Sequence, residues 1–407
     1  MITGSLSPNT ELDDVMEAAR TFLKPWTWKH GSAIDAVHDW FRTRFSVQTV
    51  ASFCSGRMAA TAILTSFAIG DGDEVLMQAF TCVAVPNSVL WSGARPVYVD
   101  IDASGNIAVH DAEKKLTNKT KAIIVQHTFG VAADIQTLAA FCKKNNLILI
   151  EDCAHSLGVK VDGKLLGTFG DAAFFSFGRD KVLSSVWGGV AIIKNIHKNE
   201  SQKLLAFEKT LPLPSMVWIA IQILHPVLFA ISMPLYRVGI GKVMIAGFKL
   251  LRLITLPIYL TELTGGMPKE LKNRYPNALA TLVRIQLKKL DRYTSMRDKT
   301  SRGYIKILSK KKKIQTFETP FGATYLRFPI LVRDPVALTL AAKKEGILLG
   351  NWYSAVIDPK GVSFAAIAYQ RGSCPRAEYF SEHIINVPTR LTLRERSFVY
   401  RFLSRHV

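Results

Sequence analysis

Short apolar runs alternate with longer amphipathic stretches along the first half of the chain. The runs cover residues 74–79, 95–100, 121–126, 147–150, 172–177 and 190–193. Runs of this length suit strands that are buried on both faces, as in a parallel sheet covered by helices. Helices are predicted over residues 11–24, 33–45, 58–67 and 134–145. The pattern therefore predicts an α/β fold with a mostly parallel central sheet flanked by helices.

The end of the chain has a different pattern. A predicted strand at 325–332 is followed by a helix at 335–345 and by a final amphipathic helix at 392–405. This order predicts a smaller C-terminal α+β domain. We divide the chain into a large domain (1–205), an apolar insertion (206–262), a connecting segment with a helix at 277–293 (263–292), and the small domain (293–407).

The insertion contains the most apolar part of the sequence. Residues 211–236 include no Asp, Glu, Lys or Arg, but four prolines interrupt them and argue against one straight helix. Basic residues follow, at Arg237, Lys242, Lys249 and Arg252. An apolar, proline-broken segment with basic flanks indicates a membrane-associated hairpin spanning 211–260. The alternative is a buried hairpin or a subunit interface.

Two polar residues follow neighbouring predicted strands. Asp152 ends the run at 147–150, and Lys181 stands just beyond the run at 172–177. Open α/β sheets bind ligands at the carboxyl ends of their strands. Pyridoxal phosphate needs a lysine amine for its Schiff base and a carboxylate beside its ring nitrogen, so this pair could serve it. Either residue alone is more often a solvated lysine or a helix-capping aspartate.

Several longer motifs strengthen the cofactor interpretation. They are SGRMAATAIL at 55–64, GDGDEVLMQAFTCVAVPNSVLWSGARPVYVDID at 70–102, EDCAH at 151–155, VDGKLLGTFGDAAFFSF at 161–177 and CPRAEYFSEHIINVPT at 374–389. Together they resemble the DegT/DnrJ/EryC1/StrS family of pyridoxal-phosphate-dependent sugar aminotransferases, in the family's order. The resemblance implies a fold-type-I transferase that works as a homodimer with its site at the subunit interface.

The resemblance also implies roles for single residues. Lys181 matches the Schiff-base lysine, Asp152 the partner of the ring nitrogen, His155 the residue beside the ring's phenolic oxygen, and Ser176 a phosphate ligand. Ser55, Gly56 and Arg57 match the phosphate-binding turn before a helix. Arg274 matches an arginine that reaches the partner subunit's phosphate. Asn351, Trp352 and Tyr353 loosely match the substrate pocket.

Four positions depart from the family pattern. Arg57 replaces Thr or Ser, Cys82 replaces an aromatic residue that stacks on the ring, Trp187 replaces Glu, and Lys272 replaces Asn. Arg57 could still bind phosphate or could point into solvent. Cys82 loses the stacking contact. These departures keep open the possibility of a catalytically degenerate relative.

Composition limits the compartment and the partners. The 407 residues include five cysteines without paired metal or disulfide spacing, which predicts no metal site and a reducing compartment. The N-terminal sequence has no signal pattern, so export is not expected. A net charge of +20 favours acidic partners, but no nucleic-acid module is recognisable. We expect a cytoplasmic protein, peripheral to the cytoplasmic face of the membrane if the insertion binds lipid.

These observations lead to one functional prediction and its alternatives. We expect an aminotransferase that moves an amino group from an amino-acid donor, glutamate by family analogy, to a nucleotide-linked keto sugar in glycoconjugate biosynthesis. A lipid-linked sugar is the variant that the insertion suggests. The alternatives are a dehydratase or epimerase that uses the same cofactor, or a degenerate membrane-associated relative. Some dehydratases of the superfamily have His at the lysine position, so Lys181 favours transamination.

Overall fold

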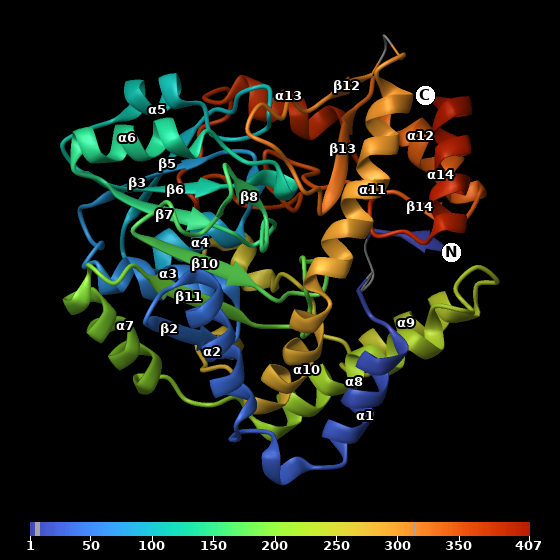
Figure 1. The fold of residues 1–407 in the computed structure, drawn as a ribbon, viewed down its shortest axis with the longest axis horizontal. Coiled ribbons are helices and arrows are strands. Elements are labelled where there is room, and N and C mark those ends of the chain that lie inside the picture. The colour runs from blue at the N-terminus through green and yellow to red at the C-terminus, as the bar shows by residue number, and fades with distance from the viewer. Residues whose placement is uncertain (5–8, 312–313) are drawn as a thin grey trace.

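A seven-stranded sheet forms the centre of the molecule. The computed structural model describes residues 1–4, 9–311 and 314–407. The strand order is β2 (Thr49–Phe53), β11 (Gly189–Ile193), β10 (Ala172–Ser176), β7 (Ile148–Asp152), β6 (Thr120–Gln126), β3 (Glu74–Gln78) and β5 (Arg95–Val99) (Figure 1). Six of these seven strands point the same way, and β11, between β2 and β10, is antiparallel to both. The predicted mostly parallel sheet is confirmed.

Each face of the sheet belongs to its own hydrophobic core. Side chains alternate between faces along a strand, so Ala122 and Ile124 of β6 enter one core while Ile123 and Val125 enter the other. The first core includes helix α3 (Gly56–Ser66), which packs on β10 and β11 and against α7 (Lys198–Thr210). The second includes α2 (Ala33–Phe45), α6 (Ile135–Asn145) and α10 (Asn277–Lys288). Helices therefore cover both faces, as the apolar strands require.

Further elements join the strands of the sheet. Helix α4 (Ala84–Trp91) leads from β3 toward β5, and α5 (Val109–Lys115) leads from β5 toward β6. The predicted turn at Asp162 and Gly163 joins two short antiparallel strands, β8 (Lys160–Val161) and β9 (Lys164–Leu165).

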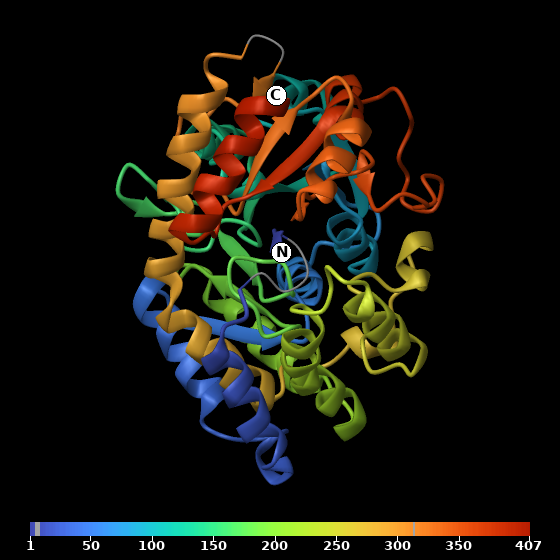
Figure 2. The same ribbon diagram turned by 90° about the vertical axis from the view of Figure 1, so that its right-hand side faces the viewer.

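The C-terminal part has the predicted α+β character. Strands β12 (Gln315–Thr316), β13 (Arg327–Leu331) and β16 (Ile384–Pro388) form an antiparallel sheet. Its helices are α11 (Leu290–Leu308), α12 (Pro335–Lys344), α13 (Pro375–His383) and α14 (Leu393–His406). Figure 2 shows this part at one end of the molecule, opposite the N-terminal helices α1 (Leu12–Phe22) and α2.

One predicted helix is two helices in the structure. The stretch 277–293 was expected to be continuous, but α10 ends at Lys288 and α11 begins at Leu290. Lys289 stands between them, and its buried Nζ donates to Asp13 and to Asp14 of α1. Our division of the chain at residues 205, 262 and 292 stays a prediction.

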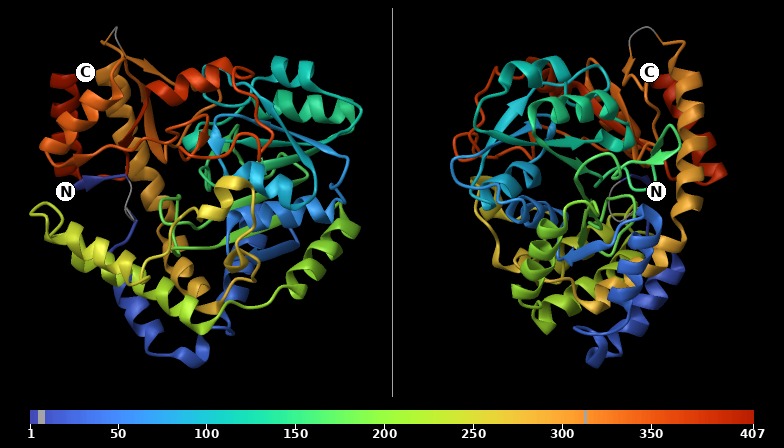
Figure 3. Two further views of the ribbon diagram at one scale, coloured as in Figure 1. Left: turned by 180° about the vertical axis from the view of Figure 1, so that it is seen from behind. Right: turned by 60° about the vertical axis from the view of Figure 1, so that its left-hand side comes forward.

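The apolar insertion folds into two helices. Helix α8 (Met216–Ser232) runs through Pro226 and ends before Pro234, while Pro212 and Pro214 precede it. It packs against α1 and α10 and buries residues such as Trp218, Ile223 and Phe229. Helix α9 (Ile240–Leu250) packs on α8 and lies at the periphery of the molecule (Figure 3).

The length of α8 sets a limit on membrane contact. Seventeen residues at about 1.5 Å each span roughly 25 Å, which is less than the roughly 30 Å hydrocarbon core of a bilayer. Within the described ranges 1–4, 9–311 and 314–407, no helix is long and apolar enough to cross a membrane.

Candidate active site

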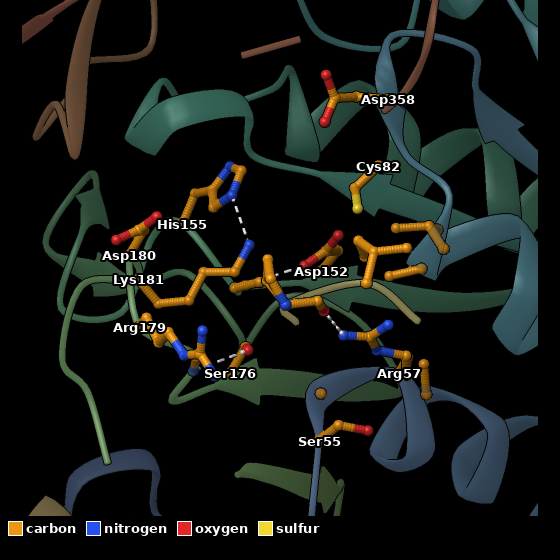
Figure 4. A pocket seen from close by; sticks show the side chains of 18 of the residues that line it. Ser55, Arg57, Cys82, Asp152, His155, Ser176, Arg179, Asp180, Lys181 and Asp358 are labelled. Atoms are coloured by element: carbon orange, nitrogen blue, oxygen red, sulfur yellow. Dashed lines mark hydrogen bonds between the residues drawn. The ribbon is translucent and has the colours of Figure 1, made fainter. Parts of the chain in front are cut away.

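Asp152, His155 and Lys181 come together at the carboxyl end of the sheet (Figure 4). Asp152 is the last residue of β7, and His155 lies in the turn that follows it. Lys181 lies in the loop between β10 and β11. Because β7 and β10 are parallel neighbours, their carboxyl ends lie side by side. The Lys181 Nζ is 2.9 Å from His155 Nε2.

The hydrogen bonds of His155 fix the state of the lysine amine. The backbone N–H of Phe129 donates to His155 Nδ1 over 3.3 Å, so the ring proton belongs on Nε2. Burial lowers the pKa of His155 well below its usual range, and burial also lowers the pKa of the Lys181 amine. We infer that a neutral imidazole donates its Nε2–H to a neutral amine. A neutral amine is the nucleophilic form of lysine.

Asp152 is a buried carboxylate. One of its oxygens accepts a hydrogen bond of 2.9 Å from the backbone N–H of Ala154. Burial raises the pKa of Asp152, and Lys181 would partly oppose this rise whenever its amine is protonated. A protonated pyridine nitrogen of bound pyridoxal phosphate beside this carboxylate would also lower the pKa of Asp152, because an opposite charge favours the ionised form.

Residues distant in the sequence hold the main chain of the lysine loop. Asn9 Nδ2 donates to the carbonyl oxygens of Lys181 (2.7 Å) and Val182 (3.0 Å). Arg297 Nη2 on α11 donates to the Val182 carbonyl (2.9 Å) and to Asn9 Oδ1 (3.1 Å). Both Asn9 and Arg297 are buried. The loop is therefore fixed by its backbone while the amine of Lys181 stays available to the pocket.

The N-terminus of α3 and the end of β10 form a close cradle. Ser55 caps α3 by accepting from the Met58 N–H over 3.2 Å. A Cβ added to Gly56 would lie 2.9 Å from Ser176 Cβ and 3.3 Å from Ser176 Oγ. Only glycine allows this approach without a shift. A helix N-terminus beside a serine hydroxyl favours a phosphate group.

Of two predicted phosphate ligands, Arg57 has its guanidinium engaged elsewhere and Arg274 lies outside the pocket lining. Arg57 lines the pocket, but its guanidinium pairs with the buried Glu262 carboxylate and donates to the Pro257 carbonyl over 2.8 Å. Arg274 is not among the described residues that line the pocket, and its backbone N–H donates to the Pro212 carbonyl. The phosphate roles of Arg57 and Arg274 stay predictions.

An aromatic ring enters the pocket from the C-terminal part. Trp352 lies 5.6 Å from the His155 ring between centroids, nearly parallel to it, and Lys181 Nζ lies 5.0 Å from the Trp352 centroid. Cys82, where relatives have an aromatic residue, also lines the pocket, and burial raises the pKa of its thiol to about 11. The thiol is therefore protonated near neutral pH.

The sequence analysis missed several lining residues. Arg179 and Asp358 contribute to the pocket, and so do Leu256, Pro257 and Ile258 of the insertion. Tyr353, which the resemblance placed near the substrate pocket, also lines the cavity. Asp358 pairs with Cys82 in register between the short parallel strands β15 (Ile357–Asp358) and β4 (Thr81–Cys82). Its closeness to the site depends on this long-range pairing, for which the local sequence gives no signal. Arg179 could have been noticed through its position two residues before Lys181.

The residues present fit pyridoxal phosphate. The cavity has a volume of about 350 Å³, within the range of roughly 300–1,000 Å³ that is usual for small-molecule sites. It offers an amine at Lys181, a buried carboxylate at Asp152 and a phosphate cradle that a Cβ at Gly56 would fill. These are the groups that this cofactor requires.

The architecture is that of fold-type-I transferases. A solved structure of GDP-4-keto-6-deoxy-D-mannose-3-dehydratase from E. coli, with bound hydrated PLP, matches with a TM-score of 0.75 at 18% identity. The match covers 99% of this chain and 100% of that one. At this identity the likeness establishes the fold alone.

The sequence establishes the family. A profile of the DegT/DnrJ/EryC1/StrS aminotransferase family matches residues 9–208 and 269–400, and the chain belongs to that family. Residues 209–262 of the insertion lie between the two matched stretches, which supports their being an addition to the family pattern.

Two curated relatives illustrate the range of the family. GDP-perosamine synthase of Vibrio cholerae is 36% identical over 168 residues, which are 41% of this chain and 46% of that protein. The chain thus spans about half the length of that relative. A pleiotropic regulatory protein of Geobacillus stearothermophilus is 27% identical over 96% of this chain and 91% of its own length.

Proposed function

We propose that this chain is a pyridoxal-phosphate-dependent aminotransferase that acts on a nucleotide-linked keto sugar. The observation that carries the proposal is the Lys181 amine, 2.9 Å from His155 Nε2, beside Asp152 and the Gly56 cradle. Family membership supports the reaction class. The names of relatives, such as GDP-perosamine synthase, support a nucleotide-linked sugar.

The residues divide the work as follows. Lys181 Nζ attaches the cofactor, Asp152 holds the proton on the ring nitrogen, and Ser55, Gly56 and Ser176 bind the phosphate. When bound, pyridoxal phosphate supplies an electron sink for a bond broken at an amino-bearing carbon. Lys181 Nζ, once free and neutral, would serve as the group that takes and delivers the proton of that carbon.

The competing functions have weaker support. A dehydratase or epimerase would use the same cofactor, but Lys181 favours transamination over the superfamily's histidine-bearing dehydratases. A degenerate relative was suggested by Arg57, Cys82, Trp187 and Lys272. Arg57 and Trp187 now have other partners in the insertion, namely Glu262 and Thr255. These two departures therefore have a structural explanation that requires no loss of activity.

The absorption spectrum of the purified protein with pyridoxal phosphate tests the proposal. We expect a visible band from cofactor attached to Lys181, lost in Lys181→Ala and converted by glutamate to the spectrum of the aminated cofactor. Circular dichroism of the variant checks that it is folded. No band in the wild-type protein would refute the proposal. A band that glutamate and other amino donors leave unchanged would favour the dehydratase alternative.

We further propose two assemblies. A homodimer is implied by the family resemblance. In such a dimer, Arg274 would bind the cofactor phosphate of the partner subunit. Peripheral membrane contact, on the cytoplasmic face, is supported by the exposed apolar residues of the α9 region, Val238, Val243, Leu250 and Leu251. They stand among exposed Arg237, Lys242, Lys249 and Arg252.

Charge favours a bilayer over a second copy at the α9 region. No Asp or Glu occurs between Glu208 and Glu262, so this segment contributes basic charges and no acidic ones to the surface. The same surface of a second copy would repel it, whereas anionic lipid headgroups would attract it. Apolar side chains next to basic ones are typical of segments that lie in the membrane interface.

A further inference from the structure

The end of the insertion forms one side of the candidate active site. We call residues 254–262 the pocket wall. Leu256, Pro257 and Ile258 of this segment line the cavity that contains Lys181. The segment begins at Ile254, which packs with Phe229 and Ile245 in the small core between α8 and α9. The family match skips the wall together with residues 209–253 of the insertion.

Thr255 connects the wall to the loop that carries Lys181. Its Oγ1 accepts hydrogen bonds from Arg179 Nη2 (2.6 Å) and from Trp187 Nε1 (3.0 Å). The same hydroxyl donates to Gln222 Oε1 on α8 over 3.1 Å. Burial lowers the pKa of Arg179 to about 10, which still leaves it charged at neutral pH. One side chain thus joins two points of the loop between β10 and β11, Arg179 and Trp187, to the insertion.

Glu262 connects the other end of the wall to α3. Its carboxylate pairs with Arg57, and both side chains are almost completely buried. Its second oxygen accepts from the Tyr259 N–H over 2.8 Å. The Arg57 guanidinium also lies 5.3 Å from the centroid of Trp187. A buried charge must be paired, so this contact favours one position of the wall.

Helix α4 holds the main chain just beyond the wall. Asn87 Nδ2 donates to the Glu262 carbonyl and Trp91 Nε1 to the Gly265 carbonyl, each over 2.9 Å. The wall is therefore attached at Thr255, at Pro257 and at Glu262, and the chain just after it is attached at Gly265. Attachments along the whole segment distinguish it from a loop that only rests on the surface.

We propose that the pocket wall is a fixed part of the active site supplied by the same chain, and that Arg57 positions the wall instead of binding the cofactor phosphate. The role of the site rests on the proposed function. Two departures from the family pattern, Arg57 and Trp187, then serve the insertion, because each binds a residue of the wall. The wall gives the pocket an apolar side of Leu256, Pro257 and Ile258, which excludes water and restricts the sugar that enters.

Four variants test the proposal. Glu262→Gln and Arg57→Gln each remove one charge of the pair, and the double variant removes both. Thr255→Val removes the central hydroxyl. Thr264→Val is the matched control, because Thr264 is exposed and its hydroxyl donates only to the nearby Thr261 carbonyl among the bonds described.

The first readout is hydrogen–deuterium exchange of residues 254–262, measured with and without pyridoxal phosphate. We expect at least a tenfold faster exchange in Glu262→Gln, Arg57→Gln and Thr255→Val, and no change in Thr264→Val. The double variant should be little worse than either charge variant, because both remove the same pair. Exchange as slow as in the wild-type protein in all variants would overturn the proposal.

The second readout is the affinity for pyridoxal phosphate. If Arg57 bound the phosphate, Arg57→Gln would weaken cofactor binding far more than Glu262→Gln, and that result would overturn the proposal. We expect instead that the two variants change the affinity by the same factor, within about threefold. Exchange without cofactor tests the wall even if the wild-type protein binds none, so failure of the proposed function is distinguishable from failure of the wall.

Discussion

At the scale of single residues, close contacts determine which substitutions and which protonation states a position near the site allows. Gly56 approaches Ser176 so closely that even a methyl group would collide with it. Both ring nitrogens of His155 have partners: Nδ1 accepts from the Phe129 N–H, so the ring proton lies on Nε2, which faces Lys181 Nζ. His38 is buried on α2, where its Nε2 lies 2.9 Å from the Ser52 hydroxyl oxygen. Gly56 and His38 yield measurable predictions.

Gly56→Ala should weaken pyridoxal phosphate binding by about tenfold or more, which corresponds to about 1.4 kcal/mol. The added Cβ would lie 2.9 Å from Ser176 Cβ, so the cradle must widen. Titration of the visible absorption band measures the affinity. A control is Gly247→Ala on α9, where a Cβ would meet no described atom within 4 Å. Equal affinity in Gly56→Ala and the wild-type protein would contradict the phosphate cradle.

His38 should make the folded protein sensitive to acid. Burial lowers the pKa of His38 to about 4, whereas the unfolded chain has a value of about 6.5. Below pH 6.5 the unfolded state binds a proton that the folded state does not, so stability falls as the pH falls toward 4. From pH 7 to pH 5.5, the free energy of unfolding should drop by about 1 kcal/mol more in the wild-type protein than in His38→Gln.

Denaturant unfolding at the two pH values measures the His38 effect. His110→Gln is the control, because His110 is exposed. The prediction fails if His38→Gln and His110→Gln lose the same stability between the two pH values.

At the scale of elements, the insertion depends on helix packing. Helix α8 covers α1 and α10 with its buried face, while α9 contacts α8 and leaves much of its own surface exposed. The pair has a small core of its own around Phe229, Ile245 and Ile254. An element with so few buried residues is marginal in stability. The effect of helix propensity on the stability of α9 should therefore be measurable.

Gly247→Ala should stabilise α9 by roughly 0.5–1 kcal/mol, because glycine loses more backbone freedom than alanine in a helix. Gly247 lies inside α9 with open space where its Cβ would be. Hydrogen exchange of the α9 amides is the appropriate measurement, since the effect is local. Faster exchange of the α9 amides in the variant than in the wild-type protein would contradict this prediction.

The sequence predicted the elements around the site better than the contacts between them. The strands that end at Asp152 and Ser176, and helix 33–45, follow from local apolar patterns. The pairing of Arg57 with Glu262 joins residues far apart in the chain, so no local pattern could reveal it. The same holds for the contacts of Lys289, whose Nζ donates to carboxylates of α1.

At the scale of the whole molecule, charge is distributed unevenly. The chain has a net charge of +20, and the region from Lys209 to Thr261 carries basic residues without acidic ones. Figure 3 places α9, in the middle of this region, at the periphery. A protein with such a surface should bind an anionic bilayer through α9.

Vesicles that contain anionic lipid should therefore bind the protein. Replacing Lys242 and Lys249 with Gln should weaken binding by roughly 10- to 30-fold, at about 1 kcal/mol for each lysine. The matched control replaces the exposed Lys143 and Lys144 of α6, with the same change in net charge. Vesicle flotation in low and high salt measures the effect. Equal loss in both double variants would show that binding is not specific to α9.

The hydrogen bonds that Asn9 and Arg297 make around the lysine loop have a consequence for the order of folding. Asn9 lies near the start of the chain, and Arg297 on α11 completes its contacts with the loop. Contacts of such long sequence separation form slowly, because large loops must close first. During synthesis the loop around Lys181 cannot reach its final form until residue 297 has left the ribosome. We expect the nascent chain to acquire its reactive amine late, after the sheet beneath it has formed.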